Sequence, residues 1–257
     1  MTESVVSPAP ADSAEVTRLE LHATPGGGCR LSGGGGVFRA VLQGAAPTGA
    51  RVALVPERAL LLAGDDVALH VTVGRGLRLE LVETGGTVAY DMRGGSARWA
   101  TRFTVEPGGC LVHETLPWVS AAGSQVERSL ELDLDIGARA LLRETLVLGR
   151  HGEEPGALTS RTRVRRNGRD VFVEELDSAD LAPHRVLDQV SSYGDFHPAS
   201  VAPGVPAYVR ADAIAAHAAP AAPGVTCLEL ASGDTVWRRL DSQAHVAAAG
   251  WIGSSGT

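Results

Sequence analysis

The chain has 257 residues, of which 44% are hydrophobic and 21% charged, a composition that suits one large β domain or two small ones. All 23 basic residues are arginine and the net charge is −7, which excludes lysine-based chemistry and leaves no evident basic face for nucleic acid. The cysteines Cys29, Cys110 and Cys227 are too far apart for a CxxC metal site, and their odd number argues against a disulfide framework. Residues 1–14 lack a signal-peptide pattern and no apolar run reaches about 18 residues, so we expect a cytoplasmic protein.

The chain divides into a loose N-terminal tail at 1–14, a single β-rich domain at 15–245 and a loose C-terminal end at 246–257. Early in the domain, the short apolar segments Val16–Leu21 and Val37–Leu42 are separated by glycine runs. The run GGGG at 33–36 lacks the Lys-Ser/Thr of a phosphate-binding loop, so we interpret it as a turn.

From Leu60 to Leu176 the pattern is that of β-strands almost throughout. Apolar and polar residues alternate with period two, which indicates half-buried strands, and glycine-bearing turns separate them. The alternation predicts strands at Val67–Val73, Leu77–Val82, Arg98–Val105 and Leu130–Ile136, followed by a hairpin of Arg161–Arg166 and Val171–Glu175 around 167–169.

A strand–turn–strand unit of about thirty residues recurs three times in this region, each time ending in Glu-Thr. The glutamates are Glu83, Glu114 and Glu144. A period of this length favours units stacked on one another in a β-helix-like body, although a β-sandwich of evenly spaced hairpins is the competing interpretation. If the units stack, the three glutamates should lie on one side of the body.

Beyond residue 180 the composition becomes rich in Ala, Pro and His. Pro206–Ala219 and Gln243–Trp251 read as helices, and Val225–Leu230 and Thr235–Arg239 read as two last strands. The predicted fold class is therefore mainly β, a β-helix-like stack of strands with a few short helices near the C-terminus.

Few residues point to catalysis. The eight histidines are scattered without an HExxH motif, no GxSxG elbow occurs, and the segment 191–195 (SSYGD) reads as a loop with exposed hydroxyls. Asp65 and Asp66 read as turn residues that bind their own backbone. The repeated glutamates either face solvent or pair with arginines such as Arg78 and Arg143, or they form an acidic track for a cation.

Four segments of the chain resemble the urease accessory protein UreD family, also called UreH, in its actinobacterial branch. They are LLLAGDDVALHVTVG (60–74), LVETGGTVAYDMRGG (81–95), residues 120–156 and, less strongly, RVRRNGRDVFVEELD (163–177). The family motifs become Ala63-Gly64-Asp65, the strand from Thr84 to Tyr90, and Glu144 followed by Gly149-Arg150. Ala63 replaces a glycine of the family's Gly-Gly-Asp, and residues 116–119 lack the family's acidic residue.

The resemblance implies a urease-maturation scaffold, not an enzyme, that binds apo-urease and the accessory proteins UreF and UreG. It also implies nickel in transit through an internal tunnel, with no permanently bound cofactor. Asp65, Glu144 and Thr84 are the matched candidates for tunnel-lining residues, and Gly64, Tyr90, Gly149 and Arg150 are the matched structural or partner-binding residues. Carboxylates that ligate weakly would let a divalent cation move on.

Two alternatives stay open on the sequence. One is a β-helix enzyme acting on polysaccharide, which the aromatic content of only 4% disfavours because such sites need aromatic platforms. The other is a UreD-like binding module for a different partner.

Overall fold

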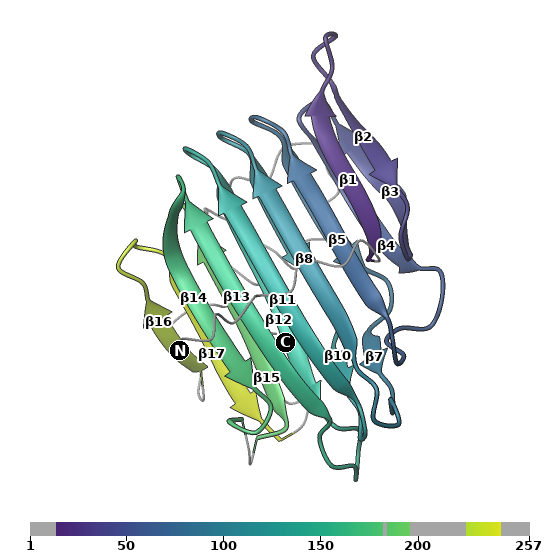
Figure 1. Cartoon of the computed structure of the whole chain (residues 1–257). Coiled ribbons are helices and arrows are strands. Elements are labelled where there is room, and N and C mark those ends of the chain that lie inside the picture. Colours follow the sequence, from purple (N-terminus) through teal and green to yellow (C-terminus); the bar gives the residue numbers. More distant parts are fainter. Residues whose placement is uncertain (1–13, 182–183, 196–224, 243–257) are drawn as a thin grey trace, which may run out of the picture.

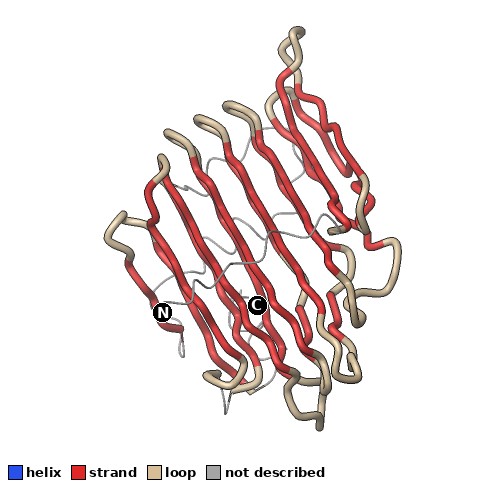
Figure 2. Tube along the Cα trace, viewed as in Figure 1, coloured by secondary structure: helices blue, strands red, loops and turns tan. Residues whose placement is uncertain are grey.

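The computed structural model describes residues 14–181, 184–195 and 225–242, and every regular element within them is a β-strand (Figures 1 and 2). The helices expected at 206–219 and 243–251 lie outside the described residues. No helix in the described part has the length and hydropathy to cross a membrane. The strands are β1 (Glu15–Ala23), β2 (Cys29–Gly34), β3 (Phe38–Ala46), β4 (Gly49–Pro56), β5 (Asp66–Val73), β6 (Arg78–Glu83), β7 (Thr87–Ala89), β8 (Ala97–Val105), β9 (Cys110–Glu114), β10 (Trp118–Ser120), β11 (Gln125–Leu134), β12 (Arg139–Leu148), β13 (Ala157–Arg166), β14 (Arg169–Asp177), β15 (Val186–Tyr193), β16 (Val225–Glu229) and β17 (Thr235–Asp241).

The strands form two sheets that pack face to face. Sheet A has the order β14-β13-β11-β8-β5-β1-β2, and sheet B has the order β16-β17-β15-β12-β9-β6-β4-β3. The short strands β7 and β10 lie off this path: β10 pairs with β7 and with the end of β12. The colours of Figure 1 advance from β1 at one side to β14 and β17 at the other, so the chain progresses along a single axis.

The predicted repeat is the structural unit of this stack. Each unit gives one strand to sheet A and the next to sheet B, as β5–β6, β8–β9 and β11–β12. Equivalent strands of successive units pair in parallel, β5 with β8 with β11 and β6 with β9 with β12. Parallel pairing of successive turns defines a β-solenoid and excludes the sandwich of antiparallel hairpins, so the β-helix-like prediction is confirmed. Antiparallel strands close both ends of the stack.

The core lies between the two sheets and follows from the alternation. In β5 every second residue from Val67 to Val73 points inward and is at most 2% exposed, and Phe103 of β8 is fully buried. Burying one such large apolar side chain contributes about 1.5–3 kcal/mol. The layer of inward side chains therefore holds the two sheets together.

Two segments expected as loops are partly strands. Gly33 and Gly34 end β2, whereas Gly35 and Gly36 lead through the expected turn to β3. Position 33 requires glycine, because its φ is +117° and a Cβ there would lie 2.0 Å from the carbonyl oxygen of Arg18. Ser191 and Tyr193 belong to β15 and are buried, so the exposed loop expected at these residues is wrong. Nearly all of β15 is buried on both faces, and this removes the alternation that marks a half-buried strand.

Candidate functional site

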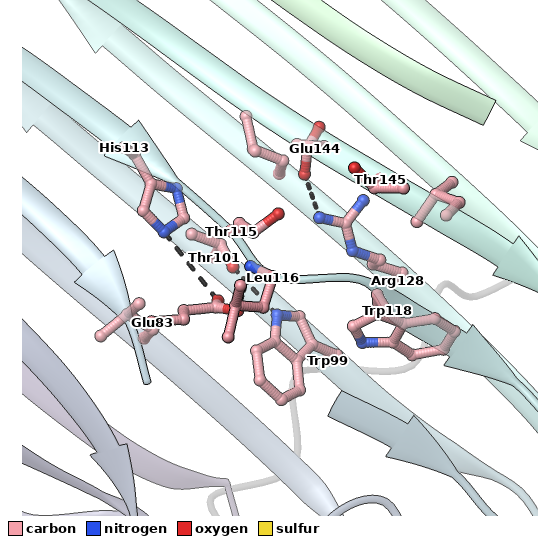
Figure 3. Close-up of a pocket in the computed structure, with 13 residues that line it drawn as sticks. Glu83, Trp99, Thr101, His113, Thr115, Leu116, Trp118, Arg128, Glu144 and Thr145 are labelled. Carbon is pink, nitrogen blue, oxygen red and sulfur yellow. Dashed lines mark hydrogen bonds and ion pairs between the residues drawn. The ribbon is translucent and has the colours of Figure 1, made fainter. Parts of the chain in front are cut away.

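A small charged cavity lies between the sheets, in the middle of the stack (Figure 3). Glu83, His113 and Glu144 enter it from sheet B, and Arg128 enters it from sheet A. Apolar residues and threonines, among them Trp99, complete its lining. The cavity has a volume of about 10 Å³, which is room for about one water-sized particle. Its size therefore suits a single ion or water.

The pairing of neighbouring strands aligns the polar side chains of sheet B. Glu144 of β12 pairs with Gln189 of β15, and Gln189 pairs with Arg238 of β17, both in antiparallel register. Thr115 follows Glu114, the register partner of both Val82 and Arg143, so it lies between Glu83 and Glu144. We call Glu83, Thr115, Glu144, Gln189 and Arg238 the polar row.

Glu114 does not belong to this row, so the expectation that all three repeated glutamates share one side is wrong. In β9 the glutamate follows the first residue, Cys110, one position earlier than Glu83 and Glu144 follow the register-equivalent residues of β6 and β12. The carboxylate therefore faces the opposite side of sheet B, where Arg143 binds it with a nitrogen–oxygen distance of 3.4 Å. Glu83 and Glu144 alone of the three face the interior.

Arg128 and Glu144 form a buried ion pair across the cavity. Their side chains are 7% and 11% exposed, and Arg128 Nη1 also donates to Ser160 Oγ at 3.3 Å. A buried pair gives little net stability because both charges lose water, but each partner becomes costly if the other is removed. The pair therefore fixes two opposite charges in the interior.

Glu83 and His113 lie at the other side of the cavity and compensate each other poorly. The Glu83 Oε2 atom accepts the N–H of Leu116 at 3.2 Å, and its Oε1 atom lies 4.0 Å from His113 Nε2. Burial raises the pKa of Glu83 to about 7, an effect that the Leu116 hydrogen bond and Arg128 reduce. Burial lowers the pKa of His113 to about 4, against the opposing effect of Glu144. His113 is therefore neutral at pH 7.

A second cavity adjoins the first and continues the charged interior along the stack. Both cavities share Arg128 and Glu144, and the second reaches Glu174 of β14 and Gln189. Arg238 binds Glu174 at 2.7 Å and donates from Nε to Gln189 at 3.0 Å. Polar groups thus extend from Glu83 to Arg238 inside the solenoid.

The three residues matched as tunnel-lining candidates do not lie together. Glu144 lines the cavity, whereas the Thr84 hydroxyl donates to the carbonyl of Leu54 at 3.0 Å. Asp65 accepts the N–H of Leu62 at 2.8 Å and binds Arg58, as a turn aspartate does. Among the described residues, no group of three or more His, Cys, Asp or Glu side chains is arranged to hold a metal ion.

The remaining motif residues hold turns and loops. Gly64 has φ +87° and donates its N–H to the carbonyl of Ser96, and Tyr90 is 38% exposed and donates its N–H to the carbonyl of Leu61. Gly149 has φ +79° in the loop after β12. Arg150 binds Glu153 there at 2.9 Å, and Glu153 also accepts the N–H of Ala122.

Sequence reasoning missed His113 and Arg128 as site residues. Both occupy inward positions of an alternating strand, His113 two residues after the buried Leu111 and Arg128 two residues before Leu130. A charged or ionisable residue at a position that alternation assigns to the core is the signal that would have found them.

The fold and the cavity define the class of this protein: a β-solenoid with a narrow, charged interior. The sequence profile of the family described as "UreD urease accessory protein" matches residues 41–253. The chain belongs to this family.

Relatives in Streptomyces carry the same description. "Urease accessory protein UreD 1" of Streptomyces griseus subsp. griseus is 48% identical over 153 residues, 56% of this chain and 60% of that protein. "Urease accessory protein UreD" of Streptomyces avermitilis is 37% identical over 197 residues, 68% of this chain and 78% of that protein. The protein of the same name in Streptomyces coelicolor is 36% identical over 185 residues, 63% of this chain and 72% of that protein.

Proposed function

We propose that the chain is a non-catalytic scaffold of urease maturation that binds apo-urease together with UreF and UreG and guides nickel to the urease active site. Membership of the UreD urease accessory protein family carries this proposal. The charged interior supports it, since a cavity of about 10 Å³ suits an ion in transit and is far too small for an organic substrate.

The oxygen-bearing members of the polar row, Glu83, Thr115, Glu144 and Gln189, are the proposed route of the cation. Carboxylate, amide and hydroxyl oxygens ligate a divalent cation weakly, so the cation would pass from one to the next instead of remaining bound. Of the candidates matched through the family, Glu144 lines the cavity, and this supports its proposed role. Asp65 and Thr84 would need to act elsewhere along the route.

Polysaccharide chemistry gains no support from the interior. A sugar ring needs a cleft many times larger than the charged cavity, and an acid pair with room for the ring between its members. Arg128 occupies the space beside Glu144 instead.

Co-purification tests the proposal. The tagged chain, expressed with UreF, UreG and apo-urease from a Streptomyces relative, should retain all three through size-exclusion chromatography. A folded chain that retains neither UreF nor apo-urease, with UreG present or absent, would contradict the scaffold role.

A further inference from the structure

His113 is a buried imidazole for which the surrounding protein supplies no hydrogen-bond partner. Its side chain is 5% exposed, and neither ring nitrogen has a partner within the described part of the chain. Phe103 packs edge-on against the ring at 5.0 Å and holds it in place. Buried polar atoms are nearly always satisfied, so two unpaired nitrogens on one ring point to a missing ligand.

Glu83 provides a second donor aimed at the same point. Its Oε2 atom accepts the Leu116 N–H, whereas Oε1 faces His113 Nε2 across 4.0 Å. Figure 3 shows the two side chains directed toward each other across the cavity. The ion pair of Arg128 is with Glu144, and Arg128 acts on Glu83 only from a distance.

We propose that Glu83 and His113 form a two-ligand site for a borderline divalent cation such as Ni²⁺, Co²⁺ or Zn²⁺. This site rests on the proposed function and gives the cation a defined stopping point within it.

The spacing of the two donors fits an ion between them. Metal–nitrogen and metal–oxygen bonds of this class are about 2.0–2.2 Å long, and the donors are 4.0 Å apart. The cavity volume of about 10 Å³ leaves room for one such ion. No hydrogen bond engages either ring nitrogen of His113 in the described part of the chain, so the ring can present a lone pair to this ion.

The chemistry of the pair selects the class of cation. One imidazole and one carboxylate suit Ni²⁺, Co²⁺ and Zn²⁺, whereas Mg²⁺ and Ca²⁺ prefer oxygen alone. Two protein ligands are fewer than the four of a permanent structural site, so the ion is held loosely. Loose binding is what passage to a further site requires.

Calorimetric titration of the purified, chelator-treated chain with NiCl₂ tests the site. We expect Glu83→Gln and His113→Asn each to weaken the tightest nickel-binding event at least tenfold. The matched controls are Glu127→Gln on the outer face of sheet A and His151→Asn in an exposed loop, which should bind as wild type does. Binding unchanged in Glu83→Gln and His113→Asn would overturn the site.

A crystal of the wild-type chain soaked in NiCl₂ gives a readout that does not depend on the variants folding. An anomalous peak at the nickel edge between Glu83 and His113 supports the site, and a water without anomalous signal there overturns it. The scaffold role has a separate readout. If the chain binds nickel at this pair but retains neither UreF nor apo-urease, the metal site is supported and the proposed function is contradicted. If the chain retains both partners but holds no nickel at the pair, the proposed function is supported and the metal site is contradicted.

Discussion

Glu83 and His113 show how burial acts in opposite directions on an acid and a base. Removing water disfavours the charged form of each, so the pKa of the carboxyl rises to about 7 and that of the imidazole falls to about 4. Arg128 and Glu144 also act on both pKa values, so the four ionisable groups together determine the charge of the cavity.

The stability of the metal-free protein should reveal these two shifts as slopes of opposite sign. Protonated Glu83 favours the folded state, so its contribution falls as the pH rises from about 4.5 to about 7. Neutral His113 also favours the folded state, so its contribution rises from about pH 4 to about 6.5. Each amounts to about 3 kcal/mol at most, and in the wild type the two largely cancel.

Urea unfolding between pH 4 and 7 in the presence of a chelator measures how the free energy of unfolding of each variant depends on pH. Relative to wild type, Glu83→Gln should gain stability with rising pH, and His113→Asn should lose it. Parallel pH profiles of the two variants would show that neither shift exists.

The Arg128–Glu144 pair should behave as a unit. Arg128→Met leaves Glu144 buried without its partner, and we expect a loss of about 3–5 kcal/mol in the free energy of unfolding. Arg128→Met combined with Glu144→Leu removes both charges and should recover most of that loss. Denaturant unfolding of the single and double variants tests the coupling, which is absent if the double variant is no more stable than Arg128→Met.

At the residue scale the sequence predicted Glu144 as an interior ligand through its match to a family motif. The sequence could not predict that Glu114 faces away from the interior. Its strand is one residue shorter between the start and the glutamate, which moves the side chain to the opposite face, and the recurring Glu-Thr pair conceals this difference. The sequence also could not pair Arg128 with Glu144, because that contact crosses between sheets.

At the scale of elements, the loop after β12 is held by close backbone contacts. Gly149 and Gly156 bracket it, and a Cβ on Gly156 would lie 2.0 Å from Ser124 Oγ and 2.4 Å from the carbonyl oxygen of Ala121. The Gly149-Arg150 motif of the family therefore belongs to a loop that packs against the turn before β11.

Gly156→Ala should destabilise the chain by about 1–3 kcal/mol, because backbone must move to admit the methyl group. Gly85→Ala is the matched control: its φ is not in the left-handed region and a Cβ there meets nothing within 4 Å, so its effect should stay within about 0.5 kcal/mol. Thermal unfolding compares the two, and equal melting temperatures would refute the steric account.

Alternation predicted the sheet A strands of the repeat, β5, β8 and β11, well because each is buried mainly on one face. It overran the end of β11, where Ile136 is 69% exposed in a turn, because turn residues can continue an alternation that no longer has a core to face. It missed β15 for the opposite reason, since burial on both faces leaves no alternation to read.

At the scale of the whole molecule, the repeat makes one continuous interior. Parallel stacking places equivalent positions of successive units side by side, so a polar side chain at an inward position of several units becomes a row. The period of about thirty residues therefore predicted the solenoid. Which side chains face its interior depends on the strand register, and the sequence pattern does not fix that register to within one residue.

The nickel content of urease tests the central claim most directly, that a charged interior guides nickel to urease. The ureD gene of a urease-producing actinobacterium would be deleted, and the strain would be complemented with the wild-type chain or with Arg128→Met/Glu144→Leu. The double variant removes the Glu144 carboxylate from the proposed route together with its partner charge, and we expect it to keep the fold. We predict nickel-loaded, active urease with the wild type, and nickel-poor urease with the double variant although it still retains UreF and apo-urease. Fully nickel-loaded urease in cells that contain only the double variant would contradict the account.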